Sequence, residues 1–328
     1  MSGVRCINRF SRFVSAILVS IMIISLTGCG NNELPLDFKS TYSLATTATE
    51  DKVSGFAESL AVTDHDVSSK NGFQPEDMSA CGLFDVDRGE VLYAKNAFAQ
   101  MSPASLTKVL TAICAFKYGN EDDIIICSDN VNKLESGASS CGLKPGDQLT
   151  LGDALRFMLL PSANDAAIAI AEHIGGSVEG FSNMMNEEAA LLGATNSHFV
   201  NPHGLSADEH YSTAYDMYLI ANAAIKYEDF CHIISLNEYS GNVVERSGEA
   251  RTIQVKSSNK FIDGTYNAPE GVTVIGGKTG TTSAAGSCLV LVTKNSSGNT
   301  FISVILKASE RSVLYEEMIQ LLEDIKTR

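Results

Sequence analysis

The residues with the clearest chemical potential are a serine and a lysine three positions apart, Ser105 and Lys108. They stand at the start of an apolar segment with helical spacing. Residues i and i+3 share one face of a helix, so the lysine amine can reach the serine hydroxyl. A serine needs a neighbouring base to become a nucleophile, and a lysine serves when burial and the positive end of a helix lower its pKa. The pair predicts nucleophilic catalysis, although the same spacing is common at solvent-facing helix starts.

Two further polar segments follow at larger intervals. Ser162 and Asn164 come directly after an apolar stretch with helical spacing. A loop serine can relay a proton to a leaving nitrogen, and an asparagine amide can orient a substrate carbonyl and a catalytic lysine. Lys278-Thr279-Gly280 ends an apolar strand. An edge strand binds an extended peptide through its backbone. Its lysine adds positive charge, its threonine hydroxyl can meet a terminal carboxylate, and its glycine leaves room for close approach.

In this order the three segments resemble the S-x-x-K, S-x-N and K-T-G motifs of penicillin-binding proteins and serine β-lactamases. The intervals between the segments also suit that superfamily. Flanking sequence narrows the resemblance to the low-molecular-mass D-Ala-D-Ala carboxypeptidases, which form serine peptidase family S11. The resemblance covers roughly Ser79 to Asp324. The stretches that carry it are Pro103–Lys108, Leu159–Ala167, Asn201–Leu205, Ser212–Met217 and Gly277–Thr282.

The resemblance implies a catalytic role for five residues. Ser105 is the implied nucleophile and Lys108 its base. Ser162 and Lys278 pass the proton on, and Asn164 positions the substrate. Attack on the penultimate D-Ala carbonyl of a peptidoglycan stem peptide expels D-alanine, and water then hydrolyses the acyl-enzyme. Penicillin and other β-lactams mimic D-Ala-D-Ala and block the serine by the same acylation, and the family needs no metal or other cofactor.

The resemblance also implies which residues bind the substrate. Thr279 and Gly280 belong to the strand against which the peptide lies. The oxyanion hole consists of the backbone N–H of Ser105 and that of Thr281, the residue just after K-T-G. Two such donors supply a few kcal/mol to the transition state, about 3 kcal/mol for one donor in a well-studied case.

The chain departs from the family pattern at two places. Members often carry an arginine near the start of the last helix that binds the substrate carboxylate. Leu314 stands at that position here, and Arg311, three residues earlier, is the candidate for the role. Several relatives also have a C-terminal β-rich domain and a terminal membrane helix. This chain stops at Arg328, so we expect an N-terminal lipid to replace the C-terminal anchor.

Three other activities could use some of these residues. A serine β-lactamase shares all three motifs but needs a further carboxylate to activate the deacylating water. We find no clear E-x-x-x-N element between Asn164 and Lys278, and Glu187 and Glu188 lie on an ordinary predicted helix. A D,D-endopeptidase that cuts cross-links would use the same residues as the carboxypeptidase. A non-catalytic penicillin sensor would usually adjoin a signalling domain, and the intact Lys108 and Lys278 favour turnover.

A cluster of histidines raises the question of a metal. His198, His203 and His210 share one segment with Asp208 and Glu209. Their spacing does not fit the H-E-x-x-H pattern of zinc hydrolases. The segment also matches the family's N-P-x-G-L loop, so the sequence favours a role in that loop over a zinc site.

The elements that must position these residues can be predicted from apolar periodicity. Strands gather at the two ends of the folded region and helices between them. We therefore predict an α/β (α+β) fold, with an antiparallel sheet flanked by helices and an inserted helical subdomain, like that of β-lactamases and transpeptidases. The predicted strands are 81–87, 90–94, 272–276, 287–293 and 300–306, and the predicted helices are 102–116, 151–160, 165–173, 181–192 and 313–326.

The N-terminus has the features of an exported lipoprotein. Arg5, Arg9 and Arg12 form a basic region, and the apolar run Val14–Ile24 is short for a membrane-spanning helix. Leu26–Cys29 resembles the lipobox, in which the signal is cut before a cysteine that carries a diacylglyceryl group. Two acyl chains make a stable anchor. We expect a signal peptide over 1–28, lipidated Cys29 with a tether over 29–78, and the D,D-peptidase domain over 79–328, on the outer face of a bacterial membrane.

Composition limits the remaining possibilities. The chain has 328 residues, 44% of them hydrophobic, and a formal net charge of −15. So acidic a protein is repelled by nucleic acids and by anionic lipid surfaces, which excludes both as electrostatic partners. Eight cysteines show no CxxC spacing. Cys81, Cys114 and Cys288 lie in apolar patterns, where we expect buried free thiols rather than disulfides.

Overall fold

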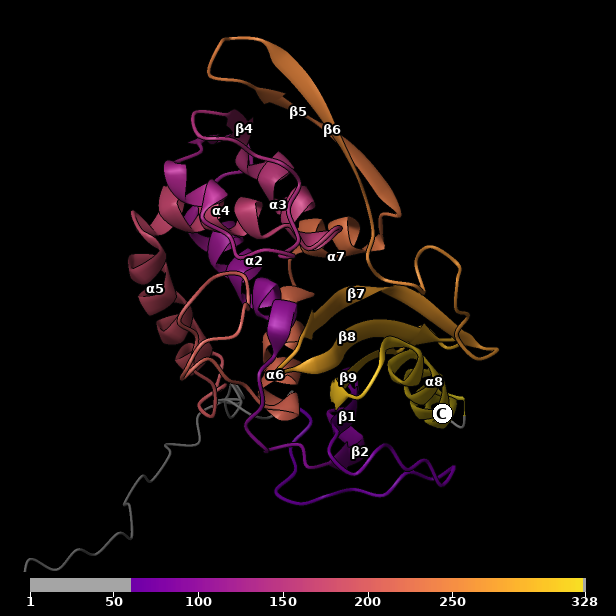
Figure 1. The fold of residues 1–328 in the computed structure, drawn as a ribbon. Helices are drawn as coiled ribbons and strands as arrows, with labels where there is room; N and C mark the ends of the chain where they lie inside the picture. The colour runs from indigo at the N-terminus through magenta and orange to yellow at the C-terminus, as the bar shows by residue number, and fades with distance from the viewer. Residues whose placement is uncertain (1–59, 327–328) are drawn as a thin grey trace, which may run out of the picture. The chain divides into compact units, whose positions relative to one another are not determined.

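The computed structural model describes residues 60–326 (Figure 1). The predicted signal peptide, Cys29 and the first part of the predicted tether lie outside the described residues. Within 60–326, no helix has the length and apolar character that a membrane span requires.

An antiparallel sheet of five strands, in the order β2-β1-β9-β8-β7, forms the centre of the fold (Figure 1). Its middle strands are buried almost throughout because both faces of the sheet are covered. On β9, Phe301 and Ile305 face the C-terminal helix α8, whereas Ile302 and Val304 face the inner helices. The strands are β1 (Ala80–Asp85), β2 (Glu90–Lys95), β7 (Val272–Thr282), β8 (Gly286–Asn295) and β9 (Thr300–Ala308).

A mostly helical region is inserted between the two groups of strands. Its central helix α2 is buried at nine consecutive positions, from Thr107 to Ala115. Capping side chains start several of the other helices: Thr150 accepts a bond from the N–H of Asp153, and Thr213 from that of Asp216. The helices of this region are α2 (Thr107–Tyr118), α3 (Leu151–Leu159), α4 (Asn164–Gly175), α5 (Val178–Leu191), α6 (Ala214–Ala224) and α7 (Glu228–Ser235), with short 3₁₀ turns at Ala104–Leu106 and Asp129–Asn132. Helix α8 (Arg311–Leu322) and a 3₁₀ turn at Glu323–Ile325 follow the last strand.

The predicted fold class and the predicted order of strands and helices are confirmed, but a second sheet was not predicted. This sheet has four strands in the order β3-β4-β5-β6, and its hairpin β5–β6 projects from the domain (Figure 1). Helices α6 and α7 were also absent from the prediction. The strands are β3 (Ile124–Ile126), β4 (Gln148–Thr150), β5 (Glu238–Val244) and β6 (Ala250–Lys256).

The segment before the first strand is packed on the domain. The N–H of Ala61 donates to the Tyr218 hydroxyl (2.9 Å), and Phe73 is buried beside Tyr93. The N–H of Asn71 donates to the carboxylate of Asp324 (3.0 Å). We expected a tether as far as residue 78, whereas residues 60–78 belong to the folded unit. Their few apolar side chains have no helical or strand period, which is why the sequence pattern did not reveal the packing.

Candidate active site

The turn that carries Ser105 is held by close backbone packing on two sides. Ala104 adopts a left-handed φ of +48°, which is unusual for a residue with a side chain. A Cβ on Gly204 would lie 1.9 Å from the carbonyl oxygen of Ala104, and a Cβ on Gly280 would lie 2.9 Å from the backbone nitrogen of Ser105. The loop of Gly204 and the strand of Gly280 therefore press against the turn, and only glycine leaves enough room at either position.

This packing gives a testable prediction for stability. Gly204→Ala should lower the free energy of unfolding by about 3 kcal/mol, because it adds a left-handed alanine and a clash with the Ala104 carbonyl. Gly298→Ala is the matched control: Gly298 has a similar φ of +86° with open space around it, so about 1 kcal/mol is expected. Urea denaturation measures both values. Equal losses in the two variants would contradict the close packing at Gly204.

Lys108 lies at the centre of the polar contacts. Its side chain is fully buried, and its Nζ lies 2.9 Å from Ser105 Oγ, 2.6 Å from Asn164 Oδ1 and 2.7 Å from the carbonyl oxygen of His203. Burial lowers the pKa of Lys108 well below its usual value, and the positive charge of Lys278 lowers it further, whereas Asp165 opposes the shift. The amine is therefore readily neutral.

Two acceptors and one hydroxyl surround the Lys108 amine. Asn164 Oδ1 and the carbonyl oxygen of His203 only accept hydrogen bonds, so they take the two N–H groups of the amine. In the structure Nζ also donates to Ser105 Oγ (2.9 Å), and the Ser105 hydroxyl donates to the carbonyl of His203 (3.4 Å). A neutral amine at this distance has a lone pair that can accept the Ser105 proton. This arrangement suits removal of the proton from Ser105 as the hydroxyl attacks.

Ser162 is held in an unusual conformation beside this group. It has a left-handed φ of +69°, and its buried Oγ has no hydrogen-bond partner among the described residues. A strained residue with a buried, unpaired hydroxyl costs stability, and such costs cluster at functional sites. The neighbouring Asn164 starts α4, and its N–H donates to the carbonyl of Ser139 (2.8 Å). The hydrogen-bonding capacity of the Ser162 hydroxyl is thus unused within the described structure.

Lys278 and Thr279 lie on β7, which is an edge strand of the main sheet. Lys278 is buried, and burial lowers its pKa to about 7. Its Nζ donates to the carbonyl of Thr279 (2.9 Å). Thr281 follows on the same strand and is exposed. The outer edge of β7 is therefore open to an extended peptide.

The structure does not bring Arg311 to the motif residues. Arg311 lies exposed at the start of α8, and within residues 60–326 no hydrogen bond or ion pair joins it to them. Ser258 lies beside Thr279 instead, with 2.6 Å between the two hydroxyl oxygens. The N–H of Ser258 also donates to the carbonyl of Leu160, so this residue links β7 to the segment of Ser162. Ser258 belongs to no motif, and nothing in the sequence singled it out.

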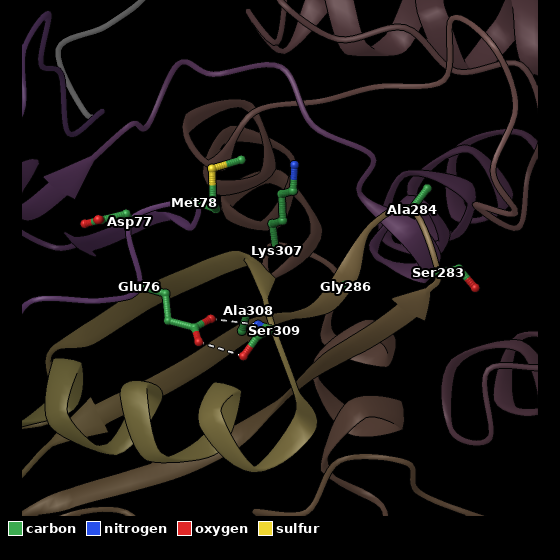
Figure 2. A pocket seen from close by; sticks show the side chains of 9 residues that line it. All are labelled: Glu76, Asp77, Met78, Ser283, Ala284, Gly286, Lys307, Ala308 and Ser309. Atoms are coloured by element: carbon green, nitrogen blue, oxygen red, sulfur yellow. Dashed lines mark hydrogen bonds between the residues drawn. The ribbon is translucent and has the colours of Figure 1, made fainter.

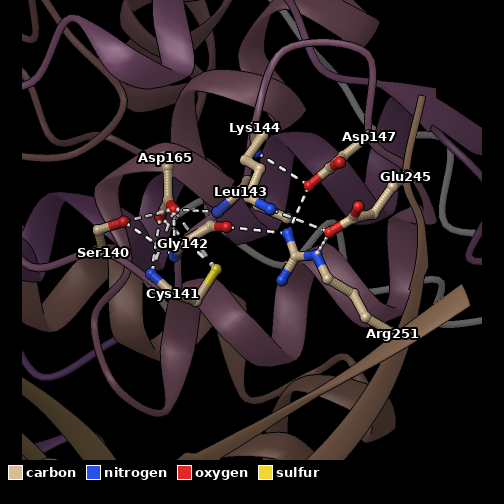
Figure 3. A network of polar contacts seen from close by, with 9 residues as sticks. All are labelled: Ser140, Cys141, Gly142, Leu143, Lys144, Asp147, Asp165, Glu245 and Arg251. Carbon is tan, nitrogen blue, oxygen red and sulfur yellow. Dashed lines mark hydrogen bonds and ion pairs between the residues drawn. The ribbon is translucent and has the colours of Figure 1, made fainter. Parts of the chain in front are cut away.

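A second polar network holds the loop of residues 140–144 (Figure 3), which directly follows Ser139, the hydrogen-bond partner of the Asn164 N–H. The buried carboxylate of Asp165 accepts bonds from the Ser140 hydroxyl (2.6 Å) and from the N–H groups of Gly142 and Leu143 (2.9 Å each). The carbonyl of Gly142 in turn accepts a bond from Arg251 of β6 (2.8 Å). Asp165 thus fixes the loop from the side of the active site, and the projecting hairpin fixes it from the other side.

We expect Asp165→Asn to change the pH dependence of the reaction as well as its rate. The loop loses an acceptor for several N–H groups, and a misplacement of about 1 Å lowers a rate up to about 100-fold. Removing the negative charge also lowers the pKa of Lys108 further, so the acid limb of the pH–rate profile moves to lower pH. Initial rates from pH 4 to 9 test this. A slower variant whose acid limb stays in place would show that Asp165 acts only through structure.

The histidines of the 198–210 segment support the loop around the nucleophile. The ring of His210 bonds to the Thr107 hydroxyl (2.9 Å), and His203 contributes its backbone carbonyl to Lys108. Burial lowers the pKa of His210 to about 4 and that of His203 to about 3. Within the part of the chain that the structure describes, no three His, Cys, Asp or Glu side chains are grouped to hold a metal ion.

Two pockets of about 380 Å³ each lie near the end of β7. One borders Thr281 and Thr282, directly after the K-T-G motif. The other lies on the far side of the Ser283–Ala284 turn, between Glu76, Met78 and Lys307, and contains none of the motif residues (Figure 2). The pocket at Thr281 and Thr282 adjoins the end of the K-T-G segment, which makes it the candidate for binding the substrate.

The structure brings the residues of the S-x-x-K, S-x-N and K-T-G segments together in one α/β domain. The chain belongs to the D-alanyl-D-alanine carboxypeptidase family, peptidase family S11, whose model matches residues 72–310. This confirms the resemblance drawn from the motifs.

Individual relatives agree with this assignment. The chain is 34% identical to D-alanyl-D-alanine carboxypeptidase DacF of Bacillus subtilis, over 72% of this chain and 60% of the relative. It is 35% identical to D-alanyl-D-alanine carboxypeptidase DacC of Escherichia coli, over 75% of this chain and 60% of that relative. The crystal structure of the Streptomyces K15 DD-transpeptidase superposes with a TM-score of 0.70 at 27% identity, covering 76% of this chain and 98% of that one. The chain thus spans about 60% of the length of the two curated relatives.

Proposed function

We propose that this chain is a serine-type D-Ala-D-Ala carboxypeptidase, which removes the terminal D-alanine of peptidoglycan stem peptides through an acyl-enzyme on Ser105. The observation that carries the proposal is the fully buried amine of Lys108, whose Nζ lies 2.9 Å from Ser105 Oγ and 2.6 Å from Asn164 Oδ1. Family membership supports the same activity. β-Lactams, which resemble D-Ala-D-Ala, would acylate the same serine.

In the first step, Lys108 takes the proton of Ser105 as Oγ attacks the carbonyl carbon of the penultimate D-Ala. The backbone N–H groups of Ser105 and Thr281 stabilise the oxyanion. As the tetrahedral intermediate collapses, the C–N bond breaks and the leaving nitrogen takes up the proton that Lys108 removed from Ser105, which leaves the Lys108 amine neutral again. The unpaired hydroxyl of Ser162 supports its role as the relay for that proton, with Lys278 as the neighbouring cation.

In the second step, water attacks the ester carbonyl of the acyl-enzyme and gives its proton to Lys108. The C–O bond to Ser105 breaks, and the proton returns from Lys108 to the serine oxygen.

Thr279 and Ser258 are positioned to bind the carboxylate of the terminal D-Ala before the first step. Their hydroxyl oxygens lie 2.6 Å apart.

The test is release of D-alanine from diacetyl-L-Lys-D-Ala-D-Ala by the purified chain. We expect release that stops after treatment with penicillin, and no release from the same peptide ending in L-Ala-L-Ala. Failure to release D-alanine from the D,D peptide by a folded chain would contradict the carboxypeptidase. Hydrolysis of cross-linked dimers alone would instead identify an endopeptidase. The carboxylate of Glu188 does not support a β-lactamase, because it is paired with Lys117 (2.5 Å).

We also propose that the chain is anchored by lipid on Cys29, with residues 1–28 removed as a signal peptide. The basic, apolar and lipobox segments of the sequence support this. The folded domain would then start near residue 60 and face the outside of the membrane, with a short tether between. Cys29→Ser is expected to abolish incorporation of labelled palmitate and to move the protein from the membrane fraction to the soluble fraction. Equal labelling of both forms would contradict the anchor.

A further inference from the structure

The pocket beside Thr281 has a distinctive charge. It lies between the end of β7, residues 135–138 and the Leu205–Ser206 segment, and its volume is about 380 Å³. Hydroxyl groups dominate its polar lining, and those of Ser206 and Thr282 are bonded to each other (3.0 Å). Glu135 is the single charged residue of the lining. Within the described residues its carboxylate has no hydrogen bond or ion pair, so this negative charge is available to a ligand.

The position of the pocket relative to the reaction centre determines which part of a peptide reaches it. β7 is an edge strand, and a peptide that adds to its free edge advances about 3.4 Å per residue. In the proposed reaction the terminal carboxylate binds at Thr279, and the scissile carbonyl binds at the N–H of Thr281, two residues further along β7. The residue that precedes D-Ala-D-Ala therefore lies beyond Thr281, alongside Thr282 and the pocket.

We propose that this pocket, called here the Glu135 pocket, binds a positively charged amine on the side chain of the residue that precedes D-Ala-D-Ala. The inference rests on the proposed carboxypeptidase function and specifies its substrate. A primary amine can pair with the Glu135 carboxylate and donate to the hydroxyls around it. An anionic side chain finds no cation there, because Lys307 belongs to the other pocket, across the Ser283–Ala284 turn (Figure 2).

The size of the effect follows from the exposure of Glu135, which lies at the surface. Exposed ion pairs are weak and screened by salt. We therefore expect a preference of about threefold to fivefold for a free amine over a neutral side chain at low ionic strength, with most of it lost in 0.5 M NaCl.

The experiment compares D-alanine release from three peptides that differ only at the lysine side chain: free ε-amine, ε-acetylated and ε-succinylated. The parent should rank them in that order by kcat/KM. Glu135→Gln should bring the ratio of free-amine to acetylated peptide to about one, and Glu135→Lys should favour the succinylated peptide. Glu249→Gln, which removes an exposed carboxylate from the distant β5–β6 turn, should keep the parent's ratio.

The outcomes separate this inference from the function on which it rests. If the parent releases D-alanine from all three peptides at equal rates, the Glu135 pocket is not an amine site, although the carboxypeptidase stands. An unchanged order of the three peptides in Glu135→Lys would likewise show that the Glu135 pocket is not an amine site, while the carboxypeptidase function would stand. If a folded parent releases none from any peptide, the proposed function fails, and this inference fails with it.

Discussion

Lys108→Met should slow D-alanine release about 1000-fold or more, because a positioned general base contributes up to about 10⁴-fold. Methionine has nearly the length of lysine and no charge, so it suits the buried position. It removes the nitrogen that lies 2.9 Å from Ser105 Oγ. The acceptors on Asn164 and His203 then lose their partner, so some loss of stability is also expected. Steady-state rates of D-alanine release measure the loss of the base, and the midpoint of urea unfolding measures the loss of stability.

Lys108→Arg provides the matched control for charge. Arginine keeps a cation in place but stays protonated, so it cannot accept the proton of Ser105. Both variants should therefore be inactive. A Lys108→Met protein that kept more than a tenth of the parent rate would mean that another group serves as the base. An active Lys108→Arg protein would mean that the site needs only the positive charge.

Ser105→Ala should lower D-alanine release by about 10⁴-fold or more and abolish covalent labelling by penicillin, since the nucleophile is lost. The fold should be preserved, because the Ser105 hydroxyl contacts only Lys108 Nζ (2.9 Å) and, at 3.4 Å, the carbonyl of His203 within the described structure. Ser240→Ala is the control, because Ser240 lies exposed on β5, away from the motifs. Circular dichroism and thermal unfolding check the fold. Residual turnover by Ser105→Ala within tenfold of the parent would exclude an acyl-enzyme on this residue.

The sequence predicted the catalytic group best where the contacts are local. Ser105 and Lys108 meet because three residues of a helical turn bring them to one face, and this requires no knowledge of the fold. The contact of Lys108 with Asn164 joins residues 56 positions apart, and only the motif resemblance could foresee it. The left-handed φ of Ser162 depends on its surroundings and has no sequence signal, because serine is not a residue that favours that region.

Other parts of the site were beyond sequence reasoning. The carbonyl of His203 binds Lys108 through the backbone, which every residue has, so residue type gives no indication. Ser258 becomes relevant only because β6 ends beside β7. Arg311 was predicted from its charge near the start of the last helix. Within the described residues no hydrogen bond or ion pair joins it to the motif residues, and its role in binding the carboxylate stays a prediction.

In the fold, too, elements with a local sequence pattern were predicted, and elements that depend on distant partners were not. The strands of the main sheet were predicted because their apolar runs are long. β3 and β4 have only three residues each, too few for a period to be recognised. β5 and β6 do alternate between buried and exposed positions, but their buried residues are few. Residues 60–78 pack through isolated apolar side chains such as Phe73, whose burial depends on partners far along the chain.

The most direct test of the acyl-enzyme is the intact mass of the parent chain after incubation with penicillin, followed by peptide mapping. We expect the mass to increase by one penicillin, and the modified peptide to contain Ser105 as the modified residue. No adduct on the folded chain, or an adduct on Ser162 in place of Ser105, would contradict the assignment of Ser105 as the nucleophile.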